Sequence, residues 1–256
     1  MDTNYNFPVE LQPIYLGSKK EISNRKAVVR TDTEAVLGVV SNEYELVRHA
    51  TVIDAFREAG KKYDIQEKVS LAQNGAYLFY QMTFPKVEAE VTKGDIVRMQ
   101  MVARNSYNSM SSLQIVFGAL RLVCTNGMVL GTKFMQFFYR HIGEVGGLNS
   151  EVTLSLYRET YKKYIKLFGE KMPLITTMAK KELPAGDGLF DKEKVMLPKY
   201  LLDEAKVSFE GSKDHTVWGY YNSLTFAISH KMKKESPNLT LGYGMEAWKV
   251  VERLVN

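Results

Sequence analysis

The spacing of hydrophobic residues changes twice along the chain, and each change predicts a different kind of element. Up to Asp32 no period is sustained, so we expect an N-terminal arm with one or two short strands. From residue 49 to 59 the hydrophobic residues recur at helical spacing, and Gly60 follows as a residue that commonly ends helices. This segment predicts a short amphipathic helix.

After Gly60 the period shortens to two, which is typical of strands. Stretches of this kind, separated by turn residues, predict an antiparallel meander over 62–72, 76–84, 86–91 and 95–103. Two further strands, 112–124 and 133–141, flank a predicted turn at 125–132, and two short strands, 35–40 and 42–47, precede the helix. We therefore expect an antiparallel sheet of about five strands.

The second half of the chain is predicted to be helical. Residues 151–172 carry hydrophobic side chains at helical spacing, and Pro173 ends or kinks that helix. Three more helices are expected over 192–209, 216–234 and 244–255. The fold class is therefore α+β, with an N-terminal arm at 1–34, an α+β core at 35–183, and a helical C-terminal region at 184–256 packed on or next to the core.

Charge changes this picture through its distribution. The net charge of +5 and the isoelectric point near 9.0 are mild. Between Asp95 and Glu144, however, the chain has no acidic residue but five basic ones, namely Arg98, Arg104, Arg121, Lys133 and Arg140. A basic segment without acids is suited to gripping a polyanion.

Within this segment, the run from Arg104 to Ser109 offers hydrogen-bond donors and no acceptor-only side chain. Phosphates need such donors, and Tyr107 could stack on a base. The alternative is a polar hairpin loop whose side chains cap their own backbone. The predicted nucleic-acid contacts are Arg98, Arg104, Asn105, Tyr107, Asn108, Arg121, Lys133 and Arg140.

Signatures of catalysis and of cofactor binding are missing from the sequence. It has no glycine-rich phosphate loop, and its four histidines lie apart without a metal-ligand spacing. We therefore expect no enzyme, no metal and no cofactor, although a hydrolase built from distant residues stays open. The single cysteine, Cys124, cannot form an internal disulfide, and no run of the sequence has the length of a membrane-spanning helix, so the cytoplasm is expected.

Several of these stretches resemble a known family in a fixed order. They include LGVVSNEYELVRHATVIDAFREAG, KGDIVRMQMVARNSYNSMSS, GALRLVCTNGMVLG and WGYYNSLTFAISHK, between Leu37 and His230. Together they resemble the phage and plasmid-associated family known as domain of unknown function 932, which implies a genomic context but no established activity. The order of a helix and a three-stranded meander also resembles the β-β-β-α core of single-strand annealing recombinases of the Rad type, which implies rings or filaments that hold single-stranded DNA.

The leading hypothesis is a bacteriophage or mobile-element protein, cytoplasmic in its bacterial host, that binds single-stranded DNA. It would form homo-oligomers and promote strand annealing in homologous recombination without ATP. The alternative is a protein-binding accessory, a counter-defence or assembly factor, that turns the same basic surface towards an acidic protein.

Overall fold

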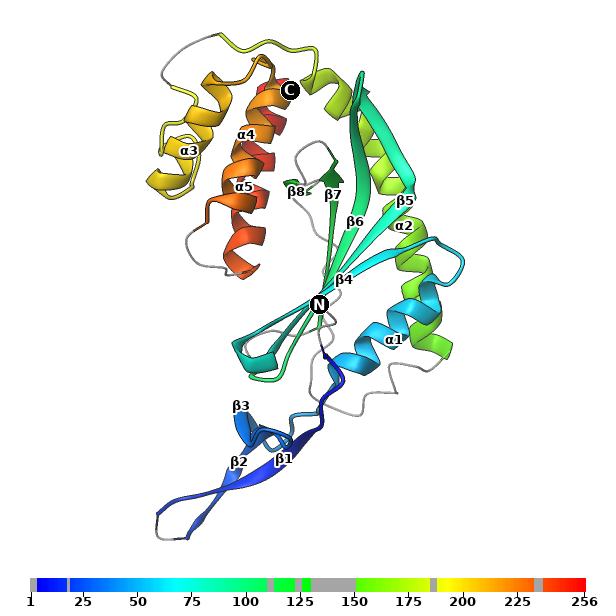
Figure 1. Cartoon of the computed structure of the whole chain (residues 1–256), viewed down its shortest axis with the longest axis vertical. Helices are drawn as coiled ribbons and strands as arrows, with labels where there is room; N and C mark the ends of the chain where they lie inside the picture. The colour runs from blue at the N-terminus through cyan, green and yellow to red at the C-terminus, as the bar shows by residue number, and fades with distance from the viewer. Residues whose placement is uncertain are drawn as a thin grey trace. The chain divides into compact units, whose positions relative to one another are not determined.

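The computed structural model describes residues 4–17, 19–109, 113–122, 126–129, 151–184, 188–232 and 237–256 (Figure 1). It confirms the α+β fold class, with antiparallel sheets and helices. The strands are β1 (Val9–Tyr15), β2 (Glu21–Arg30), β3 (Ala35–Ser41), β4 (Gln66–Ala72), β5 (Tyr77–Thr92), β6 (Asp95–Ser106), β7 (Gln114–Arg121) and β8 (Asn126–Val129). The helices are α1 (His49–Gly60), α2 (Glu151–Met178), α3 (Lys199–Glu210), α4 (Val217–His230) and α5 (Pro237–Val255), with a 3-10 turn, η1, at Gln73–Gly75.

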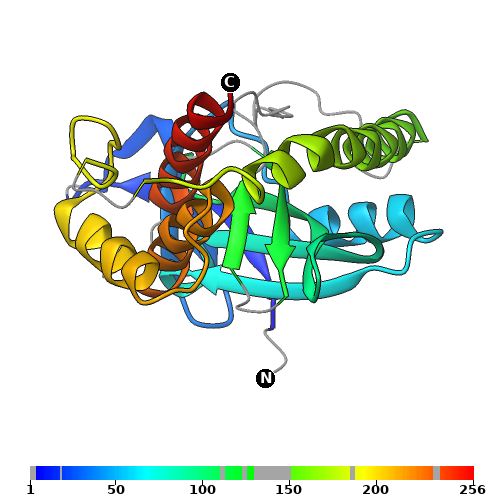
Figure 2. The ribbon, with the colours of Figure 1, turned by 90° about the horizontal axis from the view of Figure 1, so that it is seen from above.

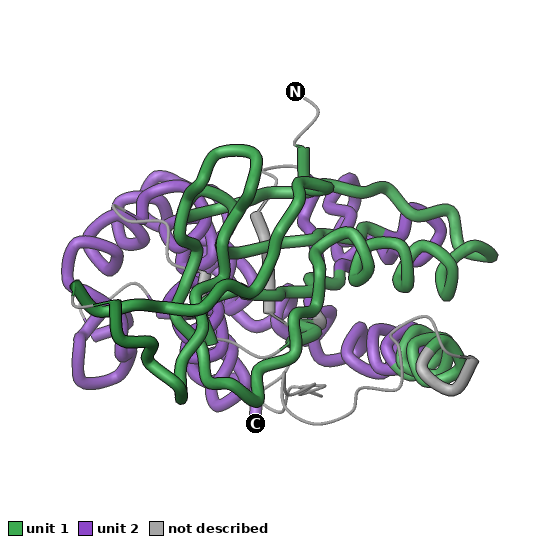
Figure 3. Tube along the Cα trace, turned by 90° about the horizontal axis from the view of Figure 1, so that it is seen from below, with its two compact units in different colours: residues 1–83, 101–116, 135–163 green, residues 84–100, 117–134, 164–256 purple. Residues whose placement is uncertain are grey.

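The strands form two sheets, one ordered β1-β2-β3 and one ordered β4-β5-β6-β7-β8. The chain also divides into two compact units, coloured in Figure 3. Unit 1 contains residues 1–83, 101–116 and 135–163, and unit 2 contains residues 84–100, 117–134 and 164–256. The three-part division drawn from the sequence, at 34 and 183, stays a prediction. Among the described residues, no helix has both the length and the apolar character needed to cross a bilayer.

The three-stranded sheet belongs to unit 1 and buries one face in a small core. Val28 pairs with Gly38 across the sheet, and Lys26 pairs with Val40. Val28 and Val40 are buried together with Phe7, Tyr44 and Tyr107 among others. The predicted arm is therefore an integral part of a sheet, because its alternate residues contribute to that core.

The strand β5 is longer than the sequence predicted. Residues 76–84 and 86–91 were expected to be separate strands, but both lie in β5, and Pro85 lies inside it. Pro85 lacks the N–H group that a ladder hydrogen bond needs. The partner strand β4 begins at Gln66, which pairs with Thr83. Beyond Thr83 no β4 residue lies beside β5, so Pro85 breaks no hydrogen bond to β4. The strand can continue through the proline for this reason.

The helix predicted at 49–59 is confirmed as α1, and it packs beside the first turns of α2 (Figure 2). The ring of Phe56 stacks on that of Tyr157 with centroids 4.4 Å apart. The Tyr161 hydroxyl donates a hydrogen bond to the carbonyl of Phe56 over 2.9 Å. Aromatic spacing along α2 therefore marks a buried contact with α1.

Three predictions about the helical half need correction or refinement. The helix α2 continues past Pro173 to Met178, because burial of Ile175 and Met178 outweighs the cost of an interior proline. The helix predicted from 192 starts only after Pro198. The last helix is longer than predicted and starts at residue 237 instead of 244.

Two predictions about strands are also corrected. Residues 42–47 form no strand, and the predicted turn at 125–132 contains β8, which pairs with β7 through Gly118 and Val129. An Asn-Gly pair is a strong turn signal, but Asn126 instead pairs with Arg121 in this ladder. The strand predicted at 133–141 lies outside the described residues.

Close packing at Gly38 gives a direct test of unit 1. A Cβ atom at Gly38 would lie 2.5 Å from the backbone Cα of Asn108, whereas one at Gly17 would have no atom within 4 Å. We expect Gly38→Ala to lower the free energy of unfolding by about 1–3 kcal/mol, because backbone cannot shift cheaply. Gly17→Ala is the matched control and should change it by less than about 0.5 kcal/mol. Urea denaturation measures both, and equal stabilities of the two variants would contradict this packing.

Candidate nucleic-acid interface

The predicted contact residues around the end of β6 are buried. Tyr107 is 1% exposed, and its ring stacks on that of His49 with centroids 4.0 Å apart. Its hydroxyl oxygen accepts a hydrogen bond of 2.8 Å from the backbone N–H of His49, the first residue of α1. Burial raises the pKa of Tyr107 to about 12, so the phenol stays neutral at physiological pH.

Asn105 completes the same cluster. Its side-chain amide donates to the carbonyl of Val47 over 2.9 Å and lies 3.0 Å from Nδ1 of His49. The other ring nitrogen of His49 lies 2.9 Å from the carbonyl of Gly75, and a carbonyl can only accept, so that nitrogen carries the proton. The cluster holds both ring nitrogens of His49 and joins the start of α1, the turn η1 and the end of β6.

Arg104 and Asn108 flank this cluster. Arg104 is 4% exposed, burial lowers the pKa of its guanidinium, and its charge lies 5.7 Å from the ring centre of Phe79. Asn108 is half-buried, and its backbone lies against Gly38. The polar run from Arg104 to Ser109 was predicted to donate hydrogen bonds to phosphates, but most of it is buried inside unit 1.

The two remaining described arginines form ion pairs in unit 2. Arg98 binds Glu88 with Nε and a carboxylate oxygen 2.7 Å apart. Arg121 grips Asp95 with two hydrogen bonds of 2.7 Å, and Trp218 donates a third to the same carboxylate over 2.8 Å. Both carboxylates lie just before the acid-free segment, so the segment lacks acids in sequence but not in space. Lys133 and Arg140, like Cys124, lie outside the described residues.

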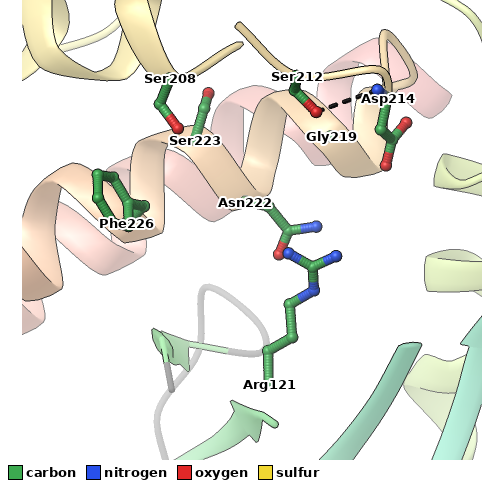
Figure 4. A pocket seen from close by; sticks show the side chains of 8 residues that line it. All are labelled: Arg121, Ser208, Ser212, Asp214, Gly219, Asn222, Ser223 and Phe226. Atoms are coloured by element: carbon green, nitrogen blue, oxygen red, sulfur yellow. Dashed lines mark hydrogen bonds between the residues drawn. The ribbon is translucent and has the colours of Figure 1, made fainter. Parts of the chain in front are cut away.

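Arg121 also lines a pocket of about 130 Å³ in unit 2 (Figure 4). The other lining residues come from α3, α4 and the loop between them, namely Ser208, Ser212, Asp214, Gly219, Asn222, Ser223 and Phe226. Asp95 already balances the charge of Arg121, and Asp214 adds a carboxylate to the lining, so the pocket does not favour a phosphate. Its volume is well below that of a typical ligand pocket.

A second hollow, of about 390 Å³, is lined in unit 1 by residues of α1 and α2 and by Lys61 and Lys62, which follow α1. Its basic side chains include Lys61, which pairs with Glu58, and Lys162, which lies 2.5 Å from Glu159. These pairs are exposed and balance two of the four positive charges in the lining, which also includes Lys62 and Arg158. Among the described residues, no group of three histidine, cysteine or acidic side chains is arranged to hold a metal ion.

Basic side chains without such partners gather instead on the hairpin of β1 and β2. The strand β3 covers β2 only from Arg25 onward, so β1 and β2 continue beyond it as a two-stranded ribbon. This ribbon and its base, residues 13–26, are called the basic ribbon here, and Figure 1 shows it in dark blue below the label β2. It carries one acid, Glu21, and four cations, namely Lys19, Lys20, Arg25 and Lys26.

Each of these four cations is available to a ligand. Lys19, Lys20 and Arg25 are exposed and Lys26 is half-buried, and within the described part of the chain none makes an ion pair. Arg25 and Lys26 are adjacent on one strand and therefore lie on opposite faces of the ribbon. Two large apolar side chains, Tyr15 at 57% and Leu16 at 53%, are exposed at the same tip.

The paired basic groups at residues 19–20 and 25–26 were visible in the sequence, although they were not predicted as a site. What the sequence did not show is that β3 stops short of the ribbon and that no described carboxylate pairs with these cations. A long segment without acids is weaker evidence for a polyanion-binding surface than a short basic hairpin. Neighbouring strands can supply carboxylates that form ion pairs with the cations of such a segment.

The geometry therefore defines an α+β protein that carries a basic β-ribbon. The chain belongs to the family described as Domain of unknown function (DUF932), whose model matches residues 36–242. The match starts in β3 and ends in α5, so the basic ribbon precedes it. No curated protein and no solved structure matches the chain significantly.

The hydroxyl of Tyr107 should matter for stability, because it satisfies a buried N–H group at the start of α1. We expect Tyr107→Phe to lower the free energy of unfolding by about 1–3 kcal/mol. The matched control is Tyr15→Phe, which removes a hydroxyl from an exposed ring and should change stability by less than about 0.5 kcal/mol. An unchanged urea midpoint in Tyr107→Phe would show that the hydroxyl is not needed there.

Proposed function

We propose that this protein, encoded by a phage or another mobile element, binds single-stranded DNA and promotes the annealing of complementary strands without ATP. The observation that carries the binding proposal is the basic ribbon, whose four cations have no described carboxylate partner. No enzymatic step, metal or cofactor is part of the proposal.

Electrostatics favours the ribbon over the arginines of β6 and β7. A phosphate that replaces Asp95 as the ion-pair partner of Arg121 displaces a carboxylate whose side chain is only 9% exposed. Leaving that carboxylate buried without its partner would cost several kcal/mol. A phosphate that contacts Lys19 displaces only water and condensed counterions from DNA, and the release of those counterions drives binding. The phosphate contacts of the proposal are therefore Lys19, Lys20, Arg25 and Lys26.

The annealing part of the proposal rests on the order of elements. Here α1 precedes the consecutive strands β4, β5 and β6, as in that β-β-β-α order, although β7 and β8 lie between β6 and α2. Shared order alone does not transmit function, so annealing needs a test of its own.

Removing charge from the ribbon should weaken binding in a salt-dependent way. We expect Lys19→Gln with Lys20→Gln to reduce the slope of log affinity against log salt by about 1.4, since each phosphate contact on a single strand contributes about 0.7. Fluorescence anisotropy with a labelled oligonucleotide at several salt concentrations measures this slope. The matched control, Lys61→Gln with Lys162→Gln, removes the same charge from cations that already have carboxylate partners and should leave the slope unchanged.

An unchanged slope in the ribbon variant would move the interface elsewhere on the protein. Absence of any binding by the wild-type chain at low salt would contradict the function itself. In that case nuclease-treated pull-downs would test the alternative of an acidic protein partner on the same surface.

Annealing is measured by energy transfer between two complementary labelled strands in the absence of ATP. We expect the protein to accelerate pairing and the Lys19→Gln, Lys20→Gln variant to lose most of that acceleration. Light scattering on a sizing column, with and without the oligonucleotide, should show copies assembling on the strand. If strands bind but pair at the protein-free rate, the annealing part of the proposal is wrong and the binding part stands.

A further inference from the structure

The tip of the basic ribbon combines two exposed apolar side chains with two lysines. Tyr15 and Leu16 are 57% and 53% exposed, and Lys19 and Lys20 follow after the turn. Single exposed apolar residues are common on protein surfaces and need no explanation. An aromatic and an aliphatic side chain held next to free cations form a surface with two chemistries, one for rings and one for phosphates.

The backbone of the tip is held by its own hydrogen bonds. The N–H of Leu16 donates to the carbonyl of Lys20 over 2.9 Å, and the N–H of Lys19 donates to the carbonyl of Leu16 over 2.8 Å. These bonds link the two sides of the turn next to Tyr15 and Leu16.

Lys19 occupies a backbone conformation that favours glycine. Its φ angle is 61°, in the left-handed region that costs a residue with a Cβ atom about 1 kcal/mol or more. A glycine at this position would be less strained. The lysine instead places a positive charge at the turn. A charge at this position lies within a few residues of Tyr15 and Leu16.

We propose that Tyr15 and Leu16 contact the bases of single-stranded DNA, while Lys19 and Lys20 hold the neighbouring phosphates. This inference rests on the proposed function and specifies which parts of the DNA the ribbon contacts. Tyr15 stacks on an unpaired base, and Leu16 packs against another base of the same strand. In duplex DNA the faces of the bases are occupied by their neighbours, so the tip selects single strands.

The experiment compares the tip with equally exposed apolar residues elsewhere on the same sheet. Val36 and Val39 on β3 are 64% and 54% exposed and provide the matched control. We expect Tyr15→Ala to weaken binding of a single strand between about 5-fold and about 160-fold, the range that corresponds to one base stacked on an aromatic ring. Val36→Ala and Val39→Ala should change it less than about twofold, and Tyr15→Phe, which keeps the ring, should bind like the wild type.

A fluorescent base analogue supplies the readout that a purely electrostatic role would not move. With 2-aminopurine in the strand, the wild-type protein should change the emission on binding, and Tyr15→Ala should remove that change while keeping the salt slope of the wild type. Duplex binding should be the same for both proteins.

The outcomes separate this inference from the function on which it rests. If Tyr15→Ala binds single strands as well as the wild type does, with the same salt slope, the ribbon contacts phosphates only and the base contact is wrong. If the wild-type protein prefers the duplex, the tip does not read unpaired bases. If the wild type binds no DNA at low salt, the proposed function fails first and this inference fails with it.

Discussion

The hydrogen bond from the first N–H group of α1 to the hydroxyl of Tyr107 is the interaction on which unit 1 depends most. The residue before the helix, Arg48, supplies no side-chain cap, and the first turn has no acidic residue. The helix start is therefore satisfied by a tyrosine 58 positions further along the chain. The same tyrosine stacks on His49, whose other bonds reach η1 and Asn105, so one cluster ties the helix to a turn and to the end of β6.

This cluster also supports the sheet that carries the basic ribbon. Tyr107 is buried with Val28 and Val40, which lie on the inner face of β2 and β3. Tyr44 follows β3 and donates its hydroxyl proton to the carbonyl of Ser106, next to Tyr107. The base of the ribbon is thus fixed by packing and hydrogen bonds, whereas its tip is exposed. A rigid base and an accessible tip are what a ribbon needs in order to present side chains to a ligand.

Local patterns in the sequence predicted local structure well. The helix α1 follows from hydrophobic spacing and Gly60, and β4 to β7 of the larger sheet follow from a period of two, although β5 was expected as two strands and β8 as a turn. The burial of Arg104, Asn105 and Tyr107 could not be predicted in this way. Their polarity shows how many donors they have but not where the acceptors are, and the acceptors of Asn105 lie 58 and 56 positions away along the chain. Unpaired polar groups would make burial costly, so the partners decide the outcome.

The same reasoning separates charge in sequence from charge in space. An antiparallel hairpin brings residues that are ten positions apart, such as Glu88 and Arg98, to within 2.7 Å. A window without acids is therefore neutralised whenever its strands pair with strands outside it. The cations of the basic ribbon avoid this because β2 extends past β3. Such a place must bind its own counterions from solution, and exchange of those ions for the phosphates of a nucleic acid costs little, because no carboxylate is left buried and alone.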